Sequence, residues 1–477
     1  MNRDLLRDLG AALAAALLVV TAVVVGTAIE HADGTLHVDW PPLYAHWDPH
    51  IGPGTPAALA VAVAVVGYGP RVAARLPWRA LLAAAWGTAA AWTWSLALID
   101  GWQRGIAGRL TTKYEYLQVI DRFQDIPGTL RGFTGHILID SPDHWPAHVA
   151  GHPPAAPLTF VLLDRIGLGG GAWAGVWCIT VGATACLGVL VTVRALAGEE
   201  LARRAAPFLV LAPAAVWMGT SADGYFAAVA AWAVALLALA ATGRRPRTAA
   251  LGSGLLFGLT CYLSYGLTLF AIVAAAVVIL GSAKVWSAGA AAAADTSTTG
   301  TGTTGTGTES KATPNRRLHT SLPLLPALPF LLVGLAVVPL LFTLAGFDWW
   351  EAYHLLVERY FQGAGGIRPY GYWVWANLAC TVLVVGLATA AGLRRAVTTV
   401  GAPATDRSRL ALLVLAALLM LLVADLSGMS KAETERIWLP FAMWLLPACA
   451  FLDRPRPWLA AQATVALLLN HLLLTGW

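Results

Sequence analysis

The sequence predicts an all-α polytopic membrane protein with about 13 transmembrane helices. Of the 477 residues, 58% are hydrophobic and only 12% are charged, and the mean hydropathy is +0.66. Soluble domains carry about 25% charged residues. Apolar runs near the length that crosses ~30 Å of hydrocarbon recur along the whole chain, which excludes an ordinary soluble domain.

In chain order, the predicted spans are residues 11–29, 56–70, 80–99, 171–194, 205–218, 224–242, 249–264, 266–282, 322–345, 373–392, 410–426, 437–452 and 458–475. The first lacks a small-x-small cleavage site and is interpreted as a retained anchor rather than a signal peptide. The shorter stretch 154–167 starts at Pro153-Pro154 and ends in glycines. It is expected to be a re-entrant or steeply tilted half-helix, shielded by protein.

Arginine-rich connections alternate with connections rich in acidic residues and histidine. Because basic residues mark cytoplasmic loops, we place the N-terminus inside and the acidic loops outside. The chain is therefore expected in the cell membrane as a multi-pass protein, with its active site and short juxtamembrane helices on the extracytoplasmic side. The net charge of +5 then reflects loop arginines and does not indicate nucleic-acid binding.

Composition divides the chain into four parts. Residues 1–79 form an N-terminal transmembrane hairpin, and residues 80–286 form a catalytic module with a large outer loop at 100–157. Residues 287–320 are rich in Ala, Thr and Gly, so they are expected to be a disordered cytoplasmic linker. Residues 321–477 form a C-terminal transmembrane module. All five cysteines fall in apolar runs, which argues against disulfides or a thiolate metal site.

The 100–157 loop is the richest polar cluster. Residues 113–120 are predicted to form an amphipathic helix at the interface, with Tyr114 and Tyr116 at headgroup depth and Glu115 beside them. A carboxylate near an apolar surface binds its proton more tightly, which suits a general base. The alternative is that most acids of the loop are merely solvated. Other candidate carboxylates in this region are Asp100, at the end of the preceding span, and Asp121.

Three histidines, His144, His148 and His152, recur every four residues before the Pro-Pro pair. Three imidazoles could bind zinc. Pro146 and Gly151 interrupt the helix that would align them, so a structural or phosphate-contacting role is favoured over a metal site. No metal ligands are assigned, and a divalent cation is left open.

Three later outer segments carry further candidates. Ser221 and Asp223 lie at an outer span end, where a charge is costly unless it faces a cavity. Arg368 and Tyr370 lie in an aromatic-rich segment, and Arg forks grip phosphate while aromatic rings pack on sugars. An ordinary interfacial aromatic belt is the alternative. Residues 427–438 place the charges of Glu433 and Arg436 at another outer span start.

These residues resemble motifs of the GT-C superfamily of integral membrane glycosyltransferases. The family pattern of an acid and an aromatic, a Pro-Pro helix start, a proline and a later acid is matched in order by Glu115-Tyr116, HPPAAPL at 152–158, Pro213 and Asp223. The segments RPYGYW (368–373) and ETERIWLPF (433–441) are similar to motifs of members related to protein mannosyltransferases and arabinosyltransferases. Tyr114 replaces the first acid of the usual acidic pair, and His152 replaces the usual Lys before Pro-Pro.

The resemblance implies transfer of a sugar, hexosyl or pentosyl, from a polyprenyl-phosphate donor by inverting displacement. The acceptor would be an extracytoplasmic glycan, glycolipid or protein. Glu115 would be the base, Asp121 an alternative base, and Asp223 would orient the acceptor or pair with a cation. The donor phosphate would be held by His148, His152 and basic residues of the late loops. The remaining substrate-binding candidates are Asp100, Tyr116, Ser221, Arg368, Tyr370, Glu433 and Arg436.

Two other functions fit the composition. A lipid-linked oligosaccharide polymerase or ligase shares the lipid-phosphate substrate and a large outer loop. A transporter or flippase would place charged or helix-breaking residues near mid-span, and the predicted spans are largely free of them. The glycine fingerprint of a cytosolic nucleotide-sugar site is missing from the sequence.

Overall fold

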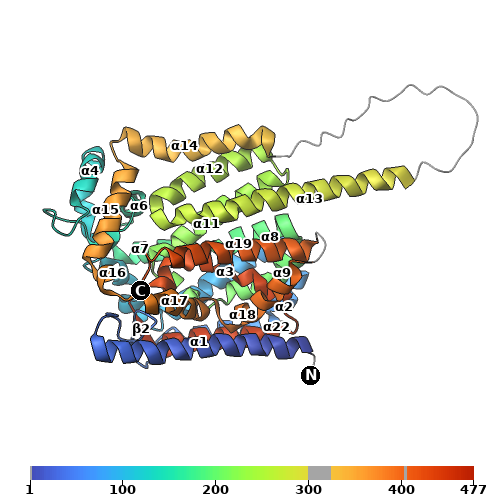
Figure 1. Cartoon of the computed structure of the whole chain (residues 1–477), viewed down its shortest axis with the longest axis horizontal. Coiled ribbons are helices and arrows are strands. Elements are labelled where there is room, and N and C mark those ends of the chain that lie inside the picture. The colour runs from blue at the N-terminus through green and yellow to red at the C-terminus, as the bar shows by residue number, and fades with distance from the viewer. Residues whose placement is uncertain (1–2, 299–323, 402–404, 477) are drawn as a thin grey trace, which may run out of the picture.

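The computed structural model describes residues 3–298, 324–401 and 405–476, and in these ranges the chain is almost entirely helical (Figure 1). Most long helices run along one axis, whereas α15 (Trp349–Gln362) crosses this direction at one end of the bundle (Figure 1). The long helices make up most of the structure. They are α1 (Arg3–Asp33), α2 (Thr55–Arg75), α3 (Trp78–Ala97), α7 (Gly170–Gly182), α8 (Ala185–Ala197), α9 (Glu199–Val210), α11 (Ala222–Ala241), α12 (Pro246–Leu263), α13 (Phe270–Thr298), α14 (Leu328–Leu344), α15 (Trp349–Gln362), α17 (Tyr370–Val385), α18 (Leu387–Thr399), α19 (Asp406–Leu426) and α22 (Pro455–Leu472).

Short elements connect them. They are η1 (Gln103–Ala107), η2 (Arg109–Thr111), η3 (Tyr116–Phe123), α4 (Ile126–Gly132), η4 (Phe133–His136), α5 (Ala147–Ala150), α6 (Ala155–Arg165), α10 (Ala215–Met218), η5 (Tyr265–Leu269), η6 (Leu325–Ala327), α16 (Ala364–Ile367), α20 (Thr434–Ile437), α21 (Leu439–Ala442) and η7 (Leu446–Phe451). Strand β1 (Ala45–Trp47) pairs antiparallel with β2 (Leu473–Thr475), with Ala45 opposite Thr475.

The chain is a multi-pass membrane protein. Seven helical segments of the described ranges are long and apolar enough to cross a membrane, and the bent pair α17 and α18 makes an eighth. The predicted count of 13 is therefore not confirmed. Residues 205–218 are two helices, α9 and α10, broken before Pro213, and residues 437–452 are the short elements α21 and η7 with Pro440 and Pro447. Proline removes a backbone donor and obstructs a continuous helix.

Two further predicted boundaries differ from the structure. The predicted span 373–392 bends by 106° between α17 and α18. Gly386 lies at the bend with φ 75°, and a Cβ there would lie 1.7 Å from Oε1 of Gln462. Only glycine fits such a position without strain. Helix α13 continues to Thr298, so the predicted linker does not begin at 287; the alanine run has high helix propensity. The rest of that linker prediction lies almost wholly outside the described residues.

Helix α6 has 11 residues. At ~1.5 Å per residue it is too short to cross the hydrocarbon. Helix α11 lies at the centre of the bundle, where it packs against α7, α8, α12 and α13, and nearly every residue along it is buried. Its alanine-rich surface allows this close packing. The first turn of α11 carries Asp223, so the core of the fold fixes the position of that carboxylate.

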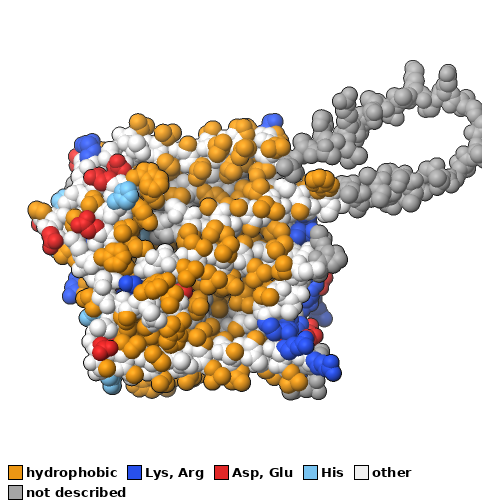
Figure 2. Space-filling view, viewed as in Figure 1, with side chains coloured by type: hydrophobic (Ala, Val, Ile, Leu, Met, Phe, Trp, Pro, Cys, Tyr) orange, Lys and Arg blue, Asp and Glu red, His pale blue; other side chains and the backbone are white. Residues whose placement is uncertain are grey.

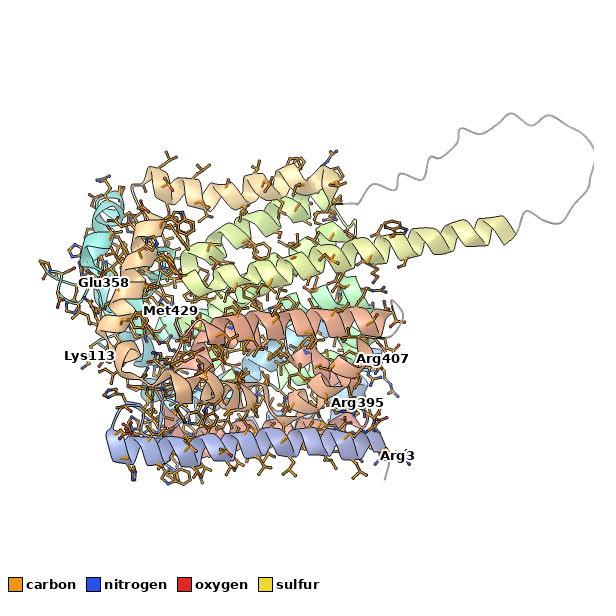
Figure 3. The ribbon with its side chains drawn as sticks, viewed as in Figure 1. Arg3, Lys113, Glu358, Arg395, Arg407 and Met429 are labelled. Carbon is orange, nitrogen blue, oxygen red and sulfur yellow. The ribbon has the colours of Figure 1, made fainter. Side chains whose placement is uncertain are left out.

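The two ends of the bundle differ in charge. Lys and Arg side chains gather at the end where the N-terminus lies, and acidic and histidine side chains gather at the opposite end (Figure 2). Arg3, Arg395 and Arg407 mark the basic end, and Lys113 and Glu358 lie at the other (Figure 3). The 100–157 loop, α15 and α16 form this second end (Figure 1).

Candidate active site

Glu115 lies immediately before the short helix η3, which starts at Tyr116 rather than at 113 as predicted. The Glu115 backbone is extended, with φ −97° and ψ 166°, and its side chain turns into the protein, with the residue 4% exposed. Tyr114 is exposed, whereas Tyr116 is buried and stacks on Phe160 at 5.5 Å. The prediction of an interface helix over 113–120 is therefore wrong in two respects. The helix begins at Tyr116, and only Tyr114 of the two tyrosines is exposed.

His148 holds the Glu115 carboxylate. The distance from His148 Nδ1 to Glu115 Oε1 is 2.9 Å, and both side chains are buried. His148 belongs to the four-residue helix α5, whose position is fixed by a hydrogen bond from the His148 backbone N–H to the carbonyl of Tyr114. The loop therefore folds back so that the carboxylate and the imidazole, 33 residues apart in sequence, face each other.

Arg436 is the centre of the cluster. Its Nη1 lies 2.9 Å from Asp223 Oδ2, and its Nη2 lies 2.9 Å from His148 Nε2 and 2.8 Å from Glu433 Oε2. Asp223 also accepts a hydrogen bond from the hydroxyl of Ser221, which caps the N-terminus of α11. One guanidinium therefore joins α11, the outer loop and the α20 segment at a single point.

The partners fix the protonation of His148. A guanidinium only donates hydrogen bonds, so His148 Nε2 must accept from Arg436. The imidazole proton is then on Nδ1, which donates to Glu115 Oε1. This assignment follows from the partners on both ring nitrogens. His148 therefore links Arg436 to Glu115, accepting through Nε2 and donating through Nδ1.

The charges around Arg436 stabilise one another. Burial alone would lower the pKa of the Arg436 guanidinium, but Asp223, Glu433 and Glu115 outweigh it and hold that pKa above its ordinary value. Burial alone would raise the pKa of Glu433, and Arg436 together with Arg368 reverses this and holds it below its ordinary value. Arg436 and Glu433 therefore stabilise each other's charged forms, as expected for buried charges that are paired.

A small cavity of about 10 Å³ lies against this cluster. That is room for about one water molecule. Its lining includes Glu115, Tyr116, His148, Ser221, Asp223 and Arg436, together with Arg109, Leu110, Thr220, Ala222 and Gly476. Glu115 Oε2 is buried and has no hydrogen-bond partner among the described residues. A buried carboxylate oxygen without a donor is costly, so it is poised to accept a hydrogen bond from a ligand.

Arg109 forms the other charged wall of the cavity. Its Nη2 lies 2.8 Å from Asp100 Oδ2, and its Nη1 donates to the carbonyl of Thr475 in β2. Asp100 also contacts Nε2 of His50 at 2.8 Å, so it fixes Arg109 rather than lining the cavity itself. Arg109 Nε is buried, and no partner for it is found within the described chain.

His152 lies beside the cluster, with its Nδ1 2.7 Å from the carbonyl of His148. Burial lowers the pKa of His152 to about 4, against the opposing effect of Asp223. The carbonyl can only accept, so Nδ1 carries the proton and Nε2 is an acceptor. A neutral imidazole in this tautomer has no second proton to donate to a phosphate oxygen.

The other predicted site residues lie apart from the cavity. Asp121 is exposed on η3 and is not among the lining residues. Arg368 is buried but donates to the carbonyls of Leu36 and Lys431, and its Nη1 is 3.7 Å from Glu433. Tyr370 is exposed, and its hydroxyl contacts the carbonyl of Leu426 at 3.3 Å. In these positions Arg368 supports Glu433, while Asp121 and Tyr370 do not line the cavity.

Sequence reasoning missed Arg109, Thr220 and the C-terminal residues Thr475 and Gly476. Arg109 lies only six positions before Glu115 in the same polar loop, which is the one available signal. The contribution of the C-terminal segment depends on the pairing of β1 with β2, across more than 400 residues, and no local pattern indicates it. The exposed His144 does not join His148. No group of three or more His, Cys, Asp or Glu side chains in the described residues is placed to hold a metal ion.

Among solved structures, the chain is similar to ArnT from Cupriavidus metallidurans bound to undecaprenyl phosphate, at 14% identity and a TM-score of 0.40, covering 82% of this chain and 60% of that one. It is also similar to the Archaeoglobus fulgidus oligosaccharyltransferase tethered with an acceptor peptide, at 13% identity and a TM-score of 0.42, covering 77% and 49%. The chain therefore spans about half to three fifths of these proteins.

No protein-family model and no curated protein matches the chain. Similarity at these TM-scores assigns no role to any residue of this chain.

Proposed function

We propose that this chain is a membrane glycosyltransferase that moves a sugar from a polyprenyl-phosphate donor to a hydroxyl of an extracytoplasmic acceptor. The observation that carries the proposal is the state of Glu115. The carboxylate is buried and lines the polar cavity, one oxygen accepts a hydrogen bond from His148, and the other has no donor among the described residues. This is what a general base needs before an acceptor hydroxyl arrives.

In the proposed reaction, the acceptor hydroxyl donates its proton to Glu115 Oε2 while its oxygen attacks the anomeric carbon. The bond from that carbon to the phosphate oxygen breaks, and the lipid phosphate leaves with the bonding electron pair. Attack from the face opposite the leaving group inverts the anomeric centre. His148 keeps the carboxylate in place throughout, so positioning supplies a large share of the rate gain.

Arg109 is the best-placed cation for the leaving phosphate. Arg109 lines the cavity; its Nη atoms are fixed by Asp100 and Thr475, while its buried Nε has no partner in the described chain. A fixed guanidinium stabilises charge that develops on a phosphate oxygen. Arg436 is already surrounded by Asp223, Glu433 and His148. We assign Arg436 to positioning, and the neutral His152 to packing against Tyr116.

The extracytoplasmic location is proposed from charge. Lys113, two residues before Glu115, lies at the end of the bundle opposite the basic end (Figure 3). Basic residues favour the cytoplasmic side, which supports an extracytoplasmic cavity. Polyprenyl-phosphate donors can reach a cavity at that boundary from within the bilayer, without a soluble nucleotide sugar. A cavity the size of one water cannot hold a sugar, so donor binding must part its walls.

The test is a transfer assay with purified protein in nanodiscs. A panel of radiolabelled polyprenyl-phosphate sugars is offered together with a lipid and glycan extract, and a parallel panel contains nucleotide sugars. The proposal predicts release of free polyprenyl phosphate and labelling of an acceptor with at least one member of the first panel. Transfer from nucleotide sugars alone, or transport of intact donor without bond cleavage, would reject it.

A further inference from the structure

A second cavity lies at the basic end of the bundle, far along the helices from Glu115. It has a volume of about 640 Å³ and lies between the end of α2 and the start of α22. We call it the arginine groove, and it is lined by Arg71, Arg75, Arg454 and Arg456 together with Pro70, Ala74, Pro455 and Pro457. Within the described residues, its lining contains no carboxylate.

The four guanidiniums have no anionic partner in the part of the chain that the structure describes, where no salt bridge involves any of them. Other arginines at this end are paired: Arg394 and Arg395 with Asp8, and Arg203 with Glu199. Asp453 is next to Arg454 in sequence but lies 2.9 Å from Arg395. The groove is therefore a local excess of positive charge rather than part of an ion-pair network.

The positive charges of the arginine groove repel one another. Arg71 and Arg75 are four residues apart on α2, a spacing at which like charges destabilise a helix. The N-terminal end of α22 adds the positive end of a helix dipole, because Pro455 to Pro457 form its first turn. An anion in the groove would relieve this repulsion and gain charge-assisted hydrogen bonds from guanidinium forks.

The surface next to the groove indicates what carries the anion. Helix α2 is one of the helices that can cross a membrane, and the exposed Leu59 and Val63 share a helix face with the groove residues Pro70 and Ala74. An apolar helix surface therefore runs along the bilayer into the groove, as needed by a ligand with acyl chains and a charged head. Anionic lipids are enriched on cytoplasmic leaflets and bind basic pockets between helices.

We infer that the arginine groove binds the phosphate headgroup of an anionic phospholipid, with the acyl chains lying along α2. The site is separate from the transferase chemistry, because its residues do not line the Glu115 cavity. Each arginine near an anionic surface is worth roughly fivefold in affinity. Removing three of them is expected to weaken lipid binding by roughly a hundredfold.

The experiment uses the full chain in nanodiscs of phosphatidylcholine alone or with added phosphatidylglycerol, and measures the thermal unfolding midpoint. The triple variant R71Q/R75Q/R454Q removes three groove charges and leaves Arg456, which donates to the carbonyl of Gly67. The control R3Q/R79Q/R244Q removes three exposed charges outside the groove. Phosphatidylglycerol is expected to raise the midpoint of the wild type and the control, and to leave the triple variant unchanged.

Two results would overturn the inference. One is an equal phosphatidylglycerol effect in the triple variant and the control. The other is an equal rise produced by inorganic phosphate in phosphatidylcholine discs, which would identify a soluble anion as the ligand. If the triple variant does not fold, R71Q and R454Q are measured singly, and each must reduce the lipid effect.

Discussion

The first prediction concerns Arg436, because one substitution there removes the shared partner of three side chains. In R436Q, Asp223 and Glu433 lose their guanidinium and His148 loses the donor to its Nε2. Asp223 then keeps the Ser221 hydroxyl as its side-chain partner. Removing one member of a buried ion pair costs about 3–5 kcal/mol, and we expect R436Q to lower the free energy of unfolding by that amount.

The cause can be separated from lost packing by a double-mutant cycle. In D223N/R436Q one of the two stranded charges is gone, so the double variant should be more stable than the sum of the single effects by roughly 1–3 kcal/mol. The matched control is R165Q, because Arg165 donates to the carbonyls of Phe123 and Gln124. We expect this control to cost about 1 kcal/mol.

The free energies of unfolding of the wild type, D223N, R436Q, D223N/R436Q and R165Q are measured by dodecyl sulfate unfolding in mixed micelles, followed by tryptophan fluorescence. If R436Q is no more destabilising than R165Q, or if the D223N and R436Q effects simply add, then Arg436 is not the electrostatic centre of the cluster.

Three further predictions address other parts of the account. Arg109→Lys keeps the charge but loses the Nε donor to the leaving phosphate, so kcat should fall about tenfold; an unchanged kcat would remove Arg109 from the stabilisation of the leaving phosphate. His152 has an ordinary pKa of 6.5 and a folded-state pKa of about 4, so the unfolded chain takes up its proton first. Its contribution to stability is complete above pH 6.5 and is lost as the pH falls towards 4; in H152Q this part of the stability loss should be missing from pH-dependent unfolding curves. For sidedness, cysteines placed at Lys113 and Glu358 should react with an impermeant maleimide in intact cells, and one at Arg407 only after permeabilisation; the reverse pattern would place the cavity in the cytoplasm.

Several members of the site could be located from the sequence because charge is scarce in an apolar chain. Glu115 and His148 lie in the polar loop 100–157, while Asp223, Glu433 and Arg436 lie at or beside the ends of predicted spans. The structure brings all five to one point. The same reasoning also selected Asp121 and Tyr370, which are exposed. Residue type and spacing do not reveal which way a side chain turns, and helix η3 begins after Glu115 rather than before it.

The fold class was predictable, but the count of spans was not. Hydropathy detects the long apolar helices, while inside the bundle a helix can carry Gln462 and Asn470 because α22 is packed against protein. Breaks such as the 106° bend at Gly386 depend on the contact with Gln462, which is distant in sequence. Arg109 was missed for a similar reason, since its anchor is the carbonyl of Thr475 on the paired strand β2.

The most direct measurement of the central claim is single-turnover sugar transfer by E115Q beside D121N. In E115Q the side-chain amide oxygen can still accept a hydrogen bond from His148 Nδ1, so the fold should be kept while the proton acceptor at the cavity is lost. We predict that the E115Q rate falls about 10²–10⁴-fold and that D121N remains near the wild type. A wild-type rate in folded E115Q, or a comparable loss in D121N, would contradict the assignment of Glu115 as the base.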